Sequence, residues 1–284
     1  MIKVLHVLSG RVSFLNHEGE NASVDALSTA LKKKNVDVRI VMPKYQEIPE
    51  TINKKIKWQE RIHVPMRWRN QYYQYCGVEH MVHENVPFYF LSNKWYFNRS
   101  GFCGFQDDAE RFAFFNKAVL EMLPFIDFQP DVIHCHDWQT GMVPALHKII
   151  YQNNAYYRHM KTVFTIHDLK EQGCFPPNVL QEYFDLGAEH LTPEGLEFYG
   201  KVNYLKGGIN YSDQITTVSP DYAQKIQSPD HGEGLDGLLR HQCHKLKGVL
   251  NGFEWDQCAD TYLKIYRNFH LEANLLPSTA NYNT

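Results

Sequence analysis

Two short segments of this 284-residue chain combine acidic and histidine side chains in a pattern that could do chemistry on a sugar or a phosphate. The first reads HCHDWQTG and contains Asp137 and Trp138. The second reads FTIHDL and contains His167 and Asp168. Aspartate and histidine can orient hydroxyl groups or move protons, and an indole ring offers a flat apolar surface to a sugar ring. An Asp-His pair is also compatible with hydrolysis, and no G-x-S-x-G motif is present to decide the reaction.

The same histidines have a purely structural interpretation. His134, His136 and His167 all lie within or next to predicted strands. A histidine in such a place is commonly a core or edge residue that hydrogen-bonds to backbone. Residue types alone leave the two interpretations open.

The elements that must position these residues follow from the apolar pattern. Short β-branched and aliphatic runs recur between amphipathic stretches, which predicts buried strands. The runs are 3–8, 36–42, 87–91, 131–136, 162–167, 214–219 and 248–251. Helices are predicted between the first two, where Val24, Leu27 and Leu31 fall at helical spacing, and after Asp107 and Asp108. The alternation predicts an α/β fold with a Rossmann-like, doubly wound, mainly parallel sheet, whose ligands bind at the carboxyl ends of strands.

Composition excludes several classes of function. The 29 basic and 32 acidic side chains give a net charge of -3, so we expect no nucleic-acid partner. No apolar run has the length of a signal peptide or a membrane span, and we expect a cytoplasmic protein with no membrane partner. The six cysteines are far apart and no zinc-site spacing occurs, so we expect reduced thiols, no metal and no cofactor.

The composition changes after about residue 255. The last ten residues lack strand and helix signals. We therefore expect one domain over residues 1–255, a tail over residues 256–284 and no second domain.

Several motifs in a fixed order extend over about residues 1–255. They are VRIVMPKY (38–45), DDAERF (107–112), HCHDWQTG (134–141), TVFTIHDL (162–169), QGCFP (172–176), YLKGGI (204–209), ITTVSPDY (215–222), GEGLDGLL (232–239) and VLNG (249–252). In order and spacing they resemble the bacterial glycogen synthases and plant starch synthases that use ADP-glucose. A set of ordered motifs is far more specific than any one of them.

The resemblance implies the amino-terminal, acceptor-side half of a two-domain GT-B glycosyltransferase. Such an enzyme moves glucose from ADP-glucose to the non-reducing 4-OH of an α-1,4-glucan such as glycogen, with retention and without a required metal. By resemblance, Asp137 lies at the acceptor site, His167 lies near the transferred glucose and its phosphates, and Asn251 lines the cleft. The implied catalytic residues are Asp137 and His167, and the implied substrate-binding residues are Trp138, Asp168 and Asn251.

The sequence departs from this family at the loop that meets the donor phosphates. The family pattern Lys-x-Gly-Gly-Leu reads Asn16-His17-Glu18-Gly19-Glu20 here, so only Gly19 of the motif remains and Asn16 replaces the lysine. Each new carboxylate would repel a phosphate charge about 6 Å away by roughly 1 to 3 kcal/mol. The alternative is that His17 or a nearby lysine supplies the lost charge, although a histidine is mostly neutral at neutral pH.

Further departures concern the acceptor side and the donor side. Gly10 stands where the family has a glutamate, and Cys103 stands where it has a tyrosine. The donor-binding carboxyl-terminal domain has no counterpart after about residue 255. We therefore expect ADP-glucose to bind only if such a domain is supplied, and we expect no transfer by the chain alone.

Three hypotheses remain open from the sequence. The chain is a synthase subunit or fragment whose donor-binding half is a separate chain, a non-catalytic glucan-binding or regulatory homologue, or a truncated gene product. Asp137, His167 and Asn251 favour the first hypothesis, and the altered loop from Asn16 to Glu20 favours the second.

Overall fold

The computed structural model describes residues 1–10, 12–15, 24–68, 71–250 and 255–275. The strands are β1 (Lys3–Val7), β2 (Asp37–Pro43), β3 (Lys57–Trp68), β4 (Gln71–His83), β5 (Val86–Ser92), β6 (Val132–His136), β7 (Lys161–Ile166), β8 (Cys174–Phe175), β9 (Glu197–Phe198), β10 (Lys201–Asn203), β11 (Gln214–Thr217) and β12 (Leu246–Gly248). The α-helices are α1 (Val24–Lys33), α2 (Glu50–Asn53), α3 (Lys94–Phe97), α4 (Asp108–Met122), α5 (Met142–Leu146), α6 (Val179–Phe184), α7 (Tyr204–Tyr211), α8 (Pro220–Lys225), α9 (Asp236–His241) and α10 (Trp255–Leu275).

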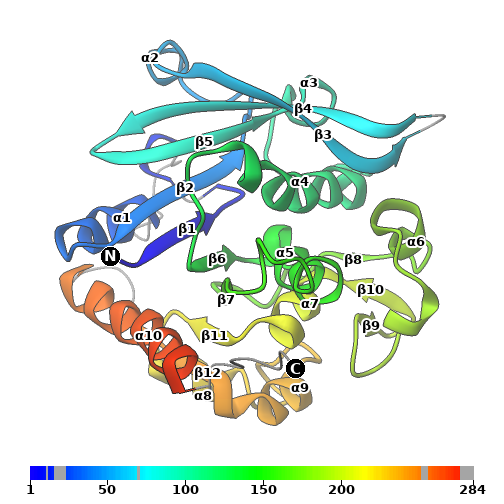
Figure 1. The fold of residues 1–284 in the computed structure, drawn as a ribbon. Coiled ribbons are helices and arrows are strands. Elements are labelled where there is room, and N and C mark those ends of the chain that lie inside the picture. The colour runs from blue at the N-terminus through cyan, green and yellow to red at the C-terminus, as the bar shows by residue number, and fades with distance from the viewer. Residues whose placement is uncertain (11, 16–23, 69–70, 251–254, 276–284) are drawn as a thin grey trace, which may run out of the picture.

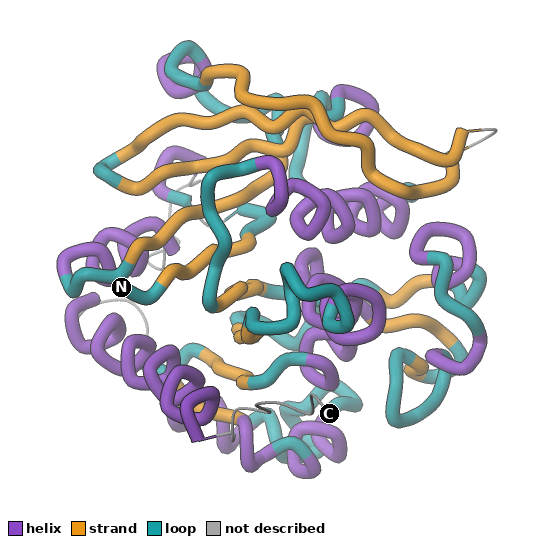
Figure 2. The backbone as a smooth tube through the Cα atoms, viewed as in Figure 1, coloured by secondary structure: helices purple, strands orange, loops and turns teal. Residues whose placement is uncertain are grey.

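One twisted sheet runs through the molecule (Figure 1). In the described residues it has nine strands in the order β12-β11-β7-β6-β1-β2-β5-β4-β3. Neighbours from β12 to β5 pair in parallel, whereas β4 is antiparallel to both β3 and β5. Figure 2 shows the parallel strands between helices and the antiparallel strands at the outer edge of the molecule. The predicted α/β, mainly parallel, doubly wound fold is confirmed.

Helices bury both faces of the parallel strands. On one face Val4, Val38, Val132 and Val163 pack with apolar residues of α1 and α10. On the other face the alternate strand residues join the large core formed with α4, α5 and α7. Figure 1 shows α1 and α10 on the same side of the sheet. Burial of both faces explains why the strand sequences are continuously apolar.

The seven predicted strands all appear, and five described strands were not predicted. They are β8, β9 and β10, which form a small separate sheet, and β3 and β4 at one edge of the main sheet. β3 and β4 form a long antiparallel extension of the sheet. In β3 the residues Ile62, Val64 and Met66 are buried while Arg61, His63 and Arg67 are exposed, which is the period-two pattern of a strand with one face on the core. Pro65 within this run argues against a central strand, but β3 lies at the sheet edge, where proline is tolerated.

The segment after residue 255, which composition marks as a tail, contains a helix in the structure. α10 buries Cys258, Ala259, Tyr262 and Tyr266 against α1 and the strand valines. These residues are spaced three and four apart, which places them on one helical face. The folded part of the chain therefore extends at least to residue 275.

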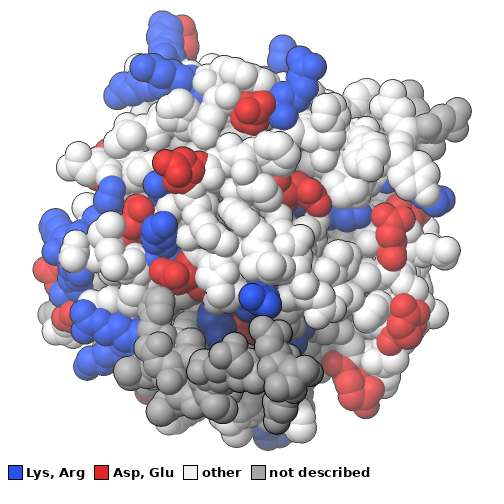
Figure 3. Space-filling model, in the orientation of Figure 1, with Lys and Arg blue, Asp and Glu red and all other residues white. Residues whose placement is uncertain are grey.

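Surface charge is spread over the face seen in Figure 3, where lysines and arginines alternate with acidic residues around a broad uncharged area. Among the described residues, no helix combines the length and the apolar content needed to cross a membrane.

Candidate functional site

The two polar segments predicted from sequence meet at the carboxyl ends of two neighbouring parallel strands. Asp137 directly follows β6, and His167 directly follows β7. The backbone N–H of His167 donates to Oδ1 of Asp137 at 2.9 Å, and the backbone N–H of Asp137 donates to the carbonyl of Thr165 at 3.0 Å. Both residues are half-buried, as expected of groups at the mouth of a site. We name the region formed by Asp137, His167 and the neighbouring Asp168 the rim.

Asp137 has a strained backbone. Its φ of 61° and ψ of 175° lie in a region that is essentially reserved for glycine. The conformation is held by the bond to Thr165 and by the N–H of Thr140, which donates to the carbonyl of Asp137 at 3.1 Å. Such strain costs on the order of 1–3 kcal/mol and occurs mainly at functional sites. Here it turns the chain sharply so that the carboxylate bridges to the next strand.

Trp138 is not the exposed sugar platform that the sequence suggested. It is 6% exposed, and its ring packs on Phe112, Phe175 and Tyr204 in the main core. Gly173, with a φ of +61°, lies so close that a Cβ there would be 2.3 Å from the indole ring. Trp138 is therefore a core residue, and its packing helps to hold the adjacent Asp137 in place.

Asp168 occupies an exposed turn at the rim. Its Oδ1 accepts the backbone N–H of Lys170 at 2.9 Å. Burial raises the pKa of the nearby Tyr222 on α8, with Asp168 as a further contribution. Tyr222 belongs to a motif seen in the sequence, but nothing in that motif marked it as facing the rim. The remaining predicted site residues, Asn16, Gly19 and Asn251, lie outside the described residues.

Hydrogen bonds join the other motif segments behind the rim. Gln172 donates from Nε2 to the carbonyl of Glu233 at 2.9 Å and accepts from Nδ2 of Asn203 at 2.6 Å. Gln172 and Asn203 are both buried. Three segments that are far apart in the sequence are thus joined by hydrogen bonds behind the loop that follows β7.

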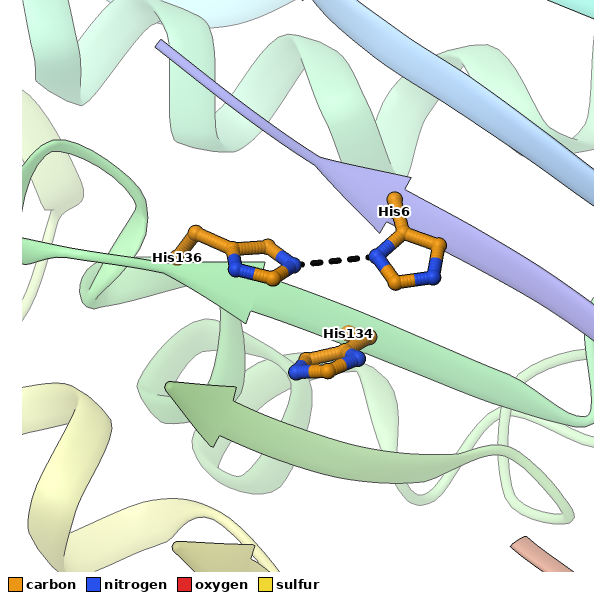
Figure 4. A group of neighbouring side chains, drawn as sticks. All are labelled: His6, His134 and His136. Atoms are coloured by element: carbon orange, nitrogen blue, oxygen red, sulfur yellow. Dashed lines mark hydrogen bonds between the residues drawn. The ribbon is translucent and has the colours of Figure 1, made fainter. Parts of the chain in front are cut away.

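Figure 4 shows three buried histidines gathered on the neighbouring strands β1 and β6. His6 on β1 pairs in register with His134 on β6, and His136 follows two residues later on the same face. Nδ1 of His6 is 3.0 Å from Nε2 of His136, and Nδ1 of His136 is 3.1 Å from Nε2 of His167. Three histidines therefore form a hydrogen-bonded chain that ends at the rim, which we name the histidine chain.

The innermost nitrogen of the histidine chain indicates in which direction its hydrogen bonds are donated. Nε2 of His6 is buried and has no hydrogen-bond partner among the described residues. If protons pointed toward His6, that nitrogen would be a buried N–H without an acceptor, and such orphan donors are rarer in proteins than orphan acceptors. The favoured polarity has His6 donating to His136 and His136 donating to His167. Neutral His167 then carries its own proton on Nδ1.

Burial keeps the deep histidines neutral. It lowers the pKa of His6 to about 3. Burial, with smaller contributions from His6 and His167, also lowers the pKa of His134 well below its usual value. Desolvation penalises the charged imidazolium, which is the physical cause in both residues.

The nitrogens of His6, His134 and His136 lie within 4.8 Å of one another, a separation that could hold a metal ion. However, both nitrogens of His134 are engaged, Nδ1 with the hydroxyl of Tyr266 at 2.8 Å and Nε2 with that of Thr165 at 2.6 Å. A metal ligand needs a free lone pair on neutral imidazole. We therefore interpret these histidines as part of a hydrogen-bonded network that α10 completes through Tyr266.

The two further departures from the family pattern, Gly10 and Cys103, lie in open or exposed surroundings. A Cβ at Gly10 would meet no described atom within 4 Å. Cys103 is exposed, and its pKa is raised, chiefly by desolvation.

Comparison with known proteins identifies what this arrangement resembles. The family model described as the starch synthase catalytic domain matches residues 3–241. The glycogen synthase of Alkaliphilus metalliredigens is 47% identical over 273 residues, which cover 95% of this chain and 57% of that protein. The glycogen synthase of Desulforamulus reducens is 49% identical over 255 residues, covering 90% and 52% respectively.

A solved structure supports the same assignment. The catalytic domain of starch synthase IV from Arabidopsis thaliana, bound to ADP and acarbose, superimposes with a TM-score of 0.79 at 29% identity. The match covers 90% of this chain and 52% of that one. The chain thus spans about half the length of the curated relatives it matches.

Proposed function

Because the chain belongs to the starch synthase catalytic domain family, we propose that it supplies the acceptor-binding half of a glucosyltransferase of the GT-B type. The proposed reaction transfers glucose from ADP-glucose to the 4-OH of an α-1,4-glucan, with retention, in cytoplasmic glycogen synthesis. The observation that carries the proposal is the rim, where Asp137 and His167 meet at the carboxyl edge of the sheet. Ligands of doubly wound sheets bind at this edge.

The rim residues have distinct proposed roles. His167 would contact a sugar or phosphate oxygen from its place at the rim, where its backbone N–H donates to Asp137 and its Nε2 faces His136. Asp137 would orient the acceptor, and its carboxylate also fixes the backbone of His167. Asp168 and Asn251 would contact substrate, with Trp138 as structural support. Catalysis would come from positioning and from stabilising the leaving diphosphate, without a metal or another cofactor.

Donor binding needs a second domain under the proposed function. We propose that ADP-glucose binds only when a carboxyl-terminal domain is supplied, because donor contacts need a second wall that closes over the rim and excludes water. The glucan acceptor needs only the half described here.

A complementation assay tests this proposal. The chain alone should transfer no radiolabelled glucose from ADP-glucose to glycogen. Adding the separately purified carboxyl-terminal half of the Alkaliphilus metalliredigens enzyme should produce transfer, and a His167→Ala chain should not support it. Robust transfer by the chain alone, or equal transfer with His167→Ala, would refute the proposed division of roles.

A second function is favoured by one specific observation, the sequence from Asn16 to Glu20. Glu18 and Glu20 stand where the family pattern has a glycine and a leucine, and Asn16 stands where it has the lysine that meets the donor phosphates. A non-catalytic glucan-binding or regulatory homologue would tolerate this loss. The discriminating variant combines Asn16→Lys, Glu18→Gly and Glu20→Leu. If complementation fails with the natural loop and appears with the restored loop, the non-catalytic function is favoured.

A further inference from the structure

The ring of His167 meets the buried histidines through its Nε2, which lies 3.1 Å from Nδ1 of His136. A neutral imidazole carries one proton, so it is a donor at one nitrogen and an acceptor at the other. The position of that proton decides whether His167 can donate a hydrogen bond from Nδ1 or accept a proton there. The protonation of His136 and His6 therefore bears on the chemistry of the rim.

The buried end of the histidine chain fixes the direction of both hydrogen bonds. His6 is fully buried and neutral, and its Nε2 has no hydrogen-bond partner among the described residues. Its single proton is therefore placed on Nδ1, which donates to Nε2 of His136 at 3.0 Å (Figure 4). Since Nε2 of His136 is then an acceptor, the proton of His136 is on Nδ1 and is donated to Nε2 of His167.

Packing holds the buried rings in this arrangement. The ring of His134 stacks on that of His136 with centroids 4.3 Å apart, and it lies 4.7 Å from the ring of His6. His134 is itself bonded at both nitrogens, to the hydroxyls of Tyr266 and Thr165. His6 and His134 are fully buried and His136 is 3% exposed, so water has little access to offer another partner. Closely packed rings keep their nitrogens in place and thereby keep the direction of the chain.

His134 and His6 differ in a way that separates a structural role from a positioning role. Both nitrogens of His134 bond to hydroxyl groups of the core, as expected of a histidine that only stabilises the fold. His6 instead leaves one buried nitrogen without a partner among the described residues, and its other nitrogen leads through His136 to the rim. Its strand neighbours Leu5 and Val7 are aliphatic, so the core at this place does not require a polar ring.

We propose that His6 and His136 are positioning residues for His167, which hold its ring as the tautomer with the proton on Nδ1 and with Nε2 as an acceptor. In this tautomer Nδ1 can donate to an oxygen of a ligand and cannot act as a general base. Under the proposed function, on which the nature of the ligand rests, the oxygen belongs to the transferred sugar or to the diphosphate that leaves it. A donor suits an oxygen on which negative charge develops.

The first test is nitrogen NMR of the whole chain with isotope-labelled histidine rings, because the chemical shift of each ring nitrogen shows whether it carries a proton. At about pH 7.5, where an ordinary histidine is neutral, His167 should be protonated on Nδ1 and not on Nε2. A neutral imidazole in water prefers the opposite tautomer. His147 is the internal control, because its Nε2 lies 3.1 Å from the carbonyl of Tyr157 and must carry the proton to bond there.

Matched substitutions separate hydrogen-bond donation from packing. His136→Asn keeps an N–H near the position of Nδ1, so His167 should keep its proton on Nδ1. His136→Phe keeps a ring without a donor, so His167 should shift toward the tautomer with the proton on Nε2. His6→Asn and His6→Phe should give the same contrast one step further from the rim. All four variants should leave the tautomer of His147 unchanged, and their unfolding transitions show whether the fold is retained.

The second test is kinetic and uses the complementation assay. His136→Phe should lower kcat about tenfold, with the KM for glycogen changed by less than about twofold. His136→Asn should stay within about twofold of the natural chain in both constants. A merely structural role predicts the opposite order, because phenylalanine is better suited than asparagine to an apolar core.

Two results would overturn the inference. One is a natural chain in which His167 carries its proton on Nε2. The other is a tautomer of His167 that is the same in His136→Asn and His136→Phe. The first result needs no variant, so it decides the question even if His136→Phe does not fold.

The inference and the proposed function fail separately. If His167 is protonated on Nδ1 but His167→Ala leaves transfer unchanged, the histidine chain positions the ring as inferred while the proposed role of His167 fails. If His167→Ala abolishes transfer but the natural His167 carries its proton on Nε2, the proposed function stands and the inference fails.

Discussion

The backbone of Asp137 stores strain at the point where function is proposed. An aspartate at φ 61° and ψ 175° is kept there by hydrogen bonds from both neighbouring segments. A glycine would adopt the same conformation without the steric cost of a Cβ. The aspartate therefore lowers the free energy of unfolding somewhat, but it places a carboxylate at the rim.

Comparing two substitutions at this position measures the strain. Both Asp137→Gly and Asp137→Ala remove the carboxylate, but only alanine keeps the Cβ. The free energy of unfolding should be about 1–3 kcal/mol higher for Asp137→Gly than for Asp137→Ala, as measured by urea denaturation. The same pair at Asp168, which is not among the residues with positive φ, is the control. Equal stabilities at residue 137 would contradict the account of strain.

The buried histidines predict how stability depends on pH. The pKa of His6 is about 3 in the folded chain and that of His134 is also lowered, so the unfolded state binds more protons below its ordinary histidine pKa. The free energy of unfolding should therefore fall as pH decreases below about 6.5, by up to about 1.4 kcal/mol per pH unit for each histidine.

The histidine contribution can be isolated by substitution. His6→Asn retains a donor near Nδ1 but does not titrate, so its stability should fall less steeply than that of the natural chain between about pH 7 and about pH 5. The exposed His159 gives the control variant, His159→Asn, which should keep the natural slope. Parallel curves for the natural chain and His6→Asn would show that His6 is not kept neutral by burial.

Trp138 gives a prediction that separates a core role from a sugar-binding role. Because its ring is 6% exposed, Trp138→Ala should lower the free energy of unfolding by about 3–5 kcal/mol, measured in urea. Trp138→Phe should cost clearly less, since it keeps an aromatic ring in the core. A Trp138→Ala chain of natural stability with weakened glycogen binding would support the platform that the sequence suggested.

At this scale the sequence identified Asp137 and His167 through the rule of strand ends, and the structure brings them together. It could not identify the histidine chain, because the register that places His6 beside His134 is a long-range property of strand pairing. It also could not show that Trp138 is buried, since Phe112 and Tyr204 come from distant segments.

At the scale of elements, α10 is part of the hydrophobic core, although the sequence predicted a tail in this segment. Its Tyr266 is fully buried and bonds to His134, and Tyr262 is buried beside it. The helix therefore couples the segment after residue 255 to the buried histidines.

Truncating Tyr266 tests this coupling. Tyr266→Ala should lower the free energy of unfolding by about 3–5 kcal/mol, because it leaves a cavity and an unpaired buried nitrogen on His134. Arg267→Ala, at an exposed position of the same helix, should change stability by less than about 0.5 kcal/mol. Similar small effects of both variants in urea denaturation would indicate that α10 is not part of the core.

The predicted strands were found because continuous apolar runs are a strong signal for strands buried on both faces. β3 and β4 were missed because their one-sided alternation includes Pro65 and many polar residues. The helix α10 was missed for a related reason, since along the sequence its buried residues alternate with exposed charged residues such as Asp260, Lys264 and Arg267. In both cases the period was present in the sequence but the mean hydropathy was low.

At the scale of the whole molecule, the chain spans about half the length of its curated relatives, and the proposed function makes it one half of a site. Under the proposed function the rim faces a second domain, and the sequence from Asn16 to Glu20 departs from the family pattern Lys-x-Gly-Gly-Leu. Each carboxylate of that loop would weaken diphosphate binding by roughly 1 to 3 kcal/mol. The expected consequence is a weaker donor affinity with an intact acceptor side.

The central claim, that this chain is a functional acceptor half, is tested most directly by a fusion enzyme. Residues 1–254 are joined to the carboxyl-terminal half of the Alkaliphilus metalliredigens glycogen synthase, and transfer of radiolabelled glucose from ADP-glucose to glycogen is measured. We predict transfer that rises when the loop is restored by Asn16→Lys, Glu18→Gly and Glu20→Leu, and that is lost with His167→Ala in either background. A correctly folded fusion without transfer, even with the restored loop, would contradict the claim.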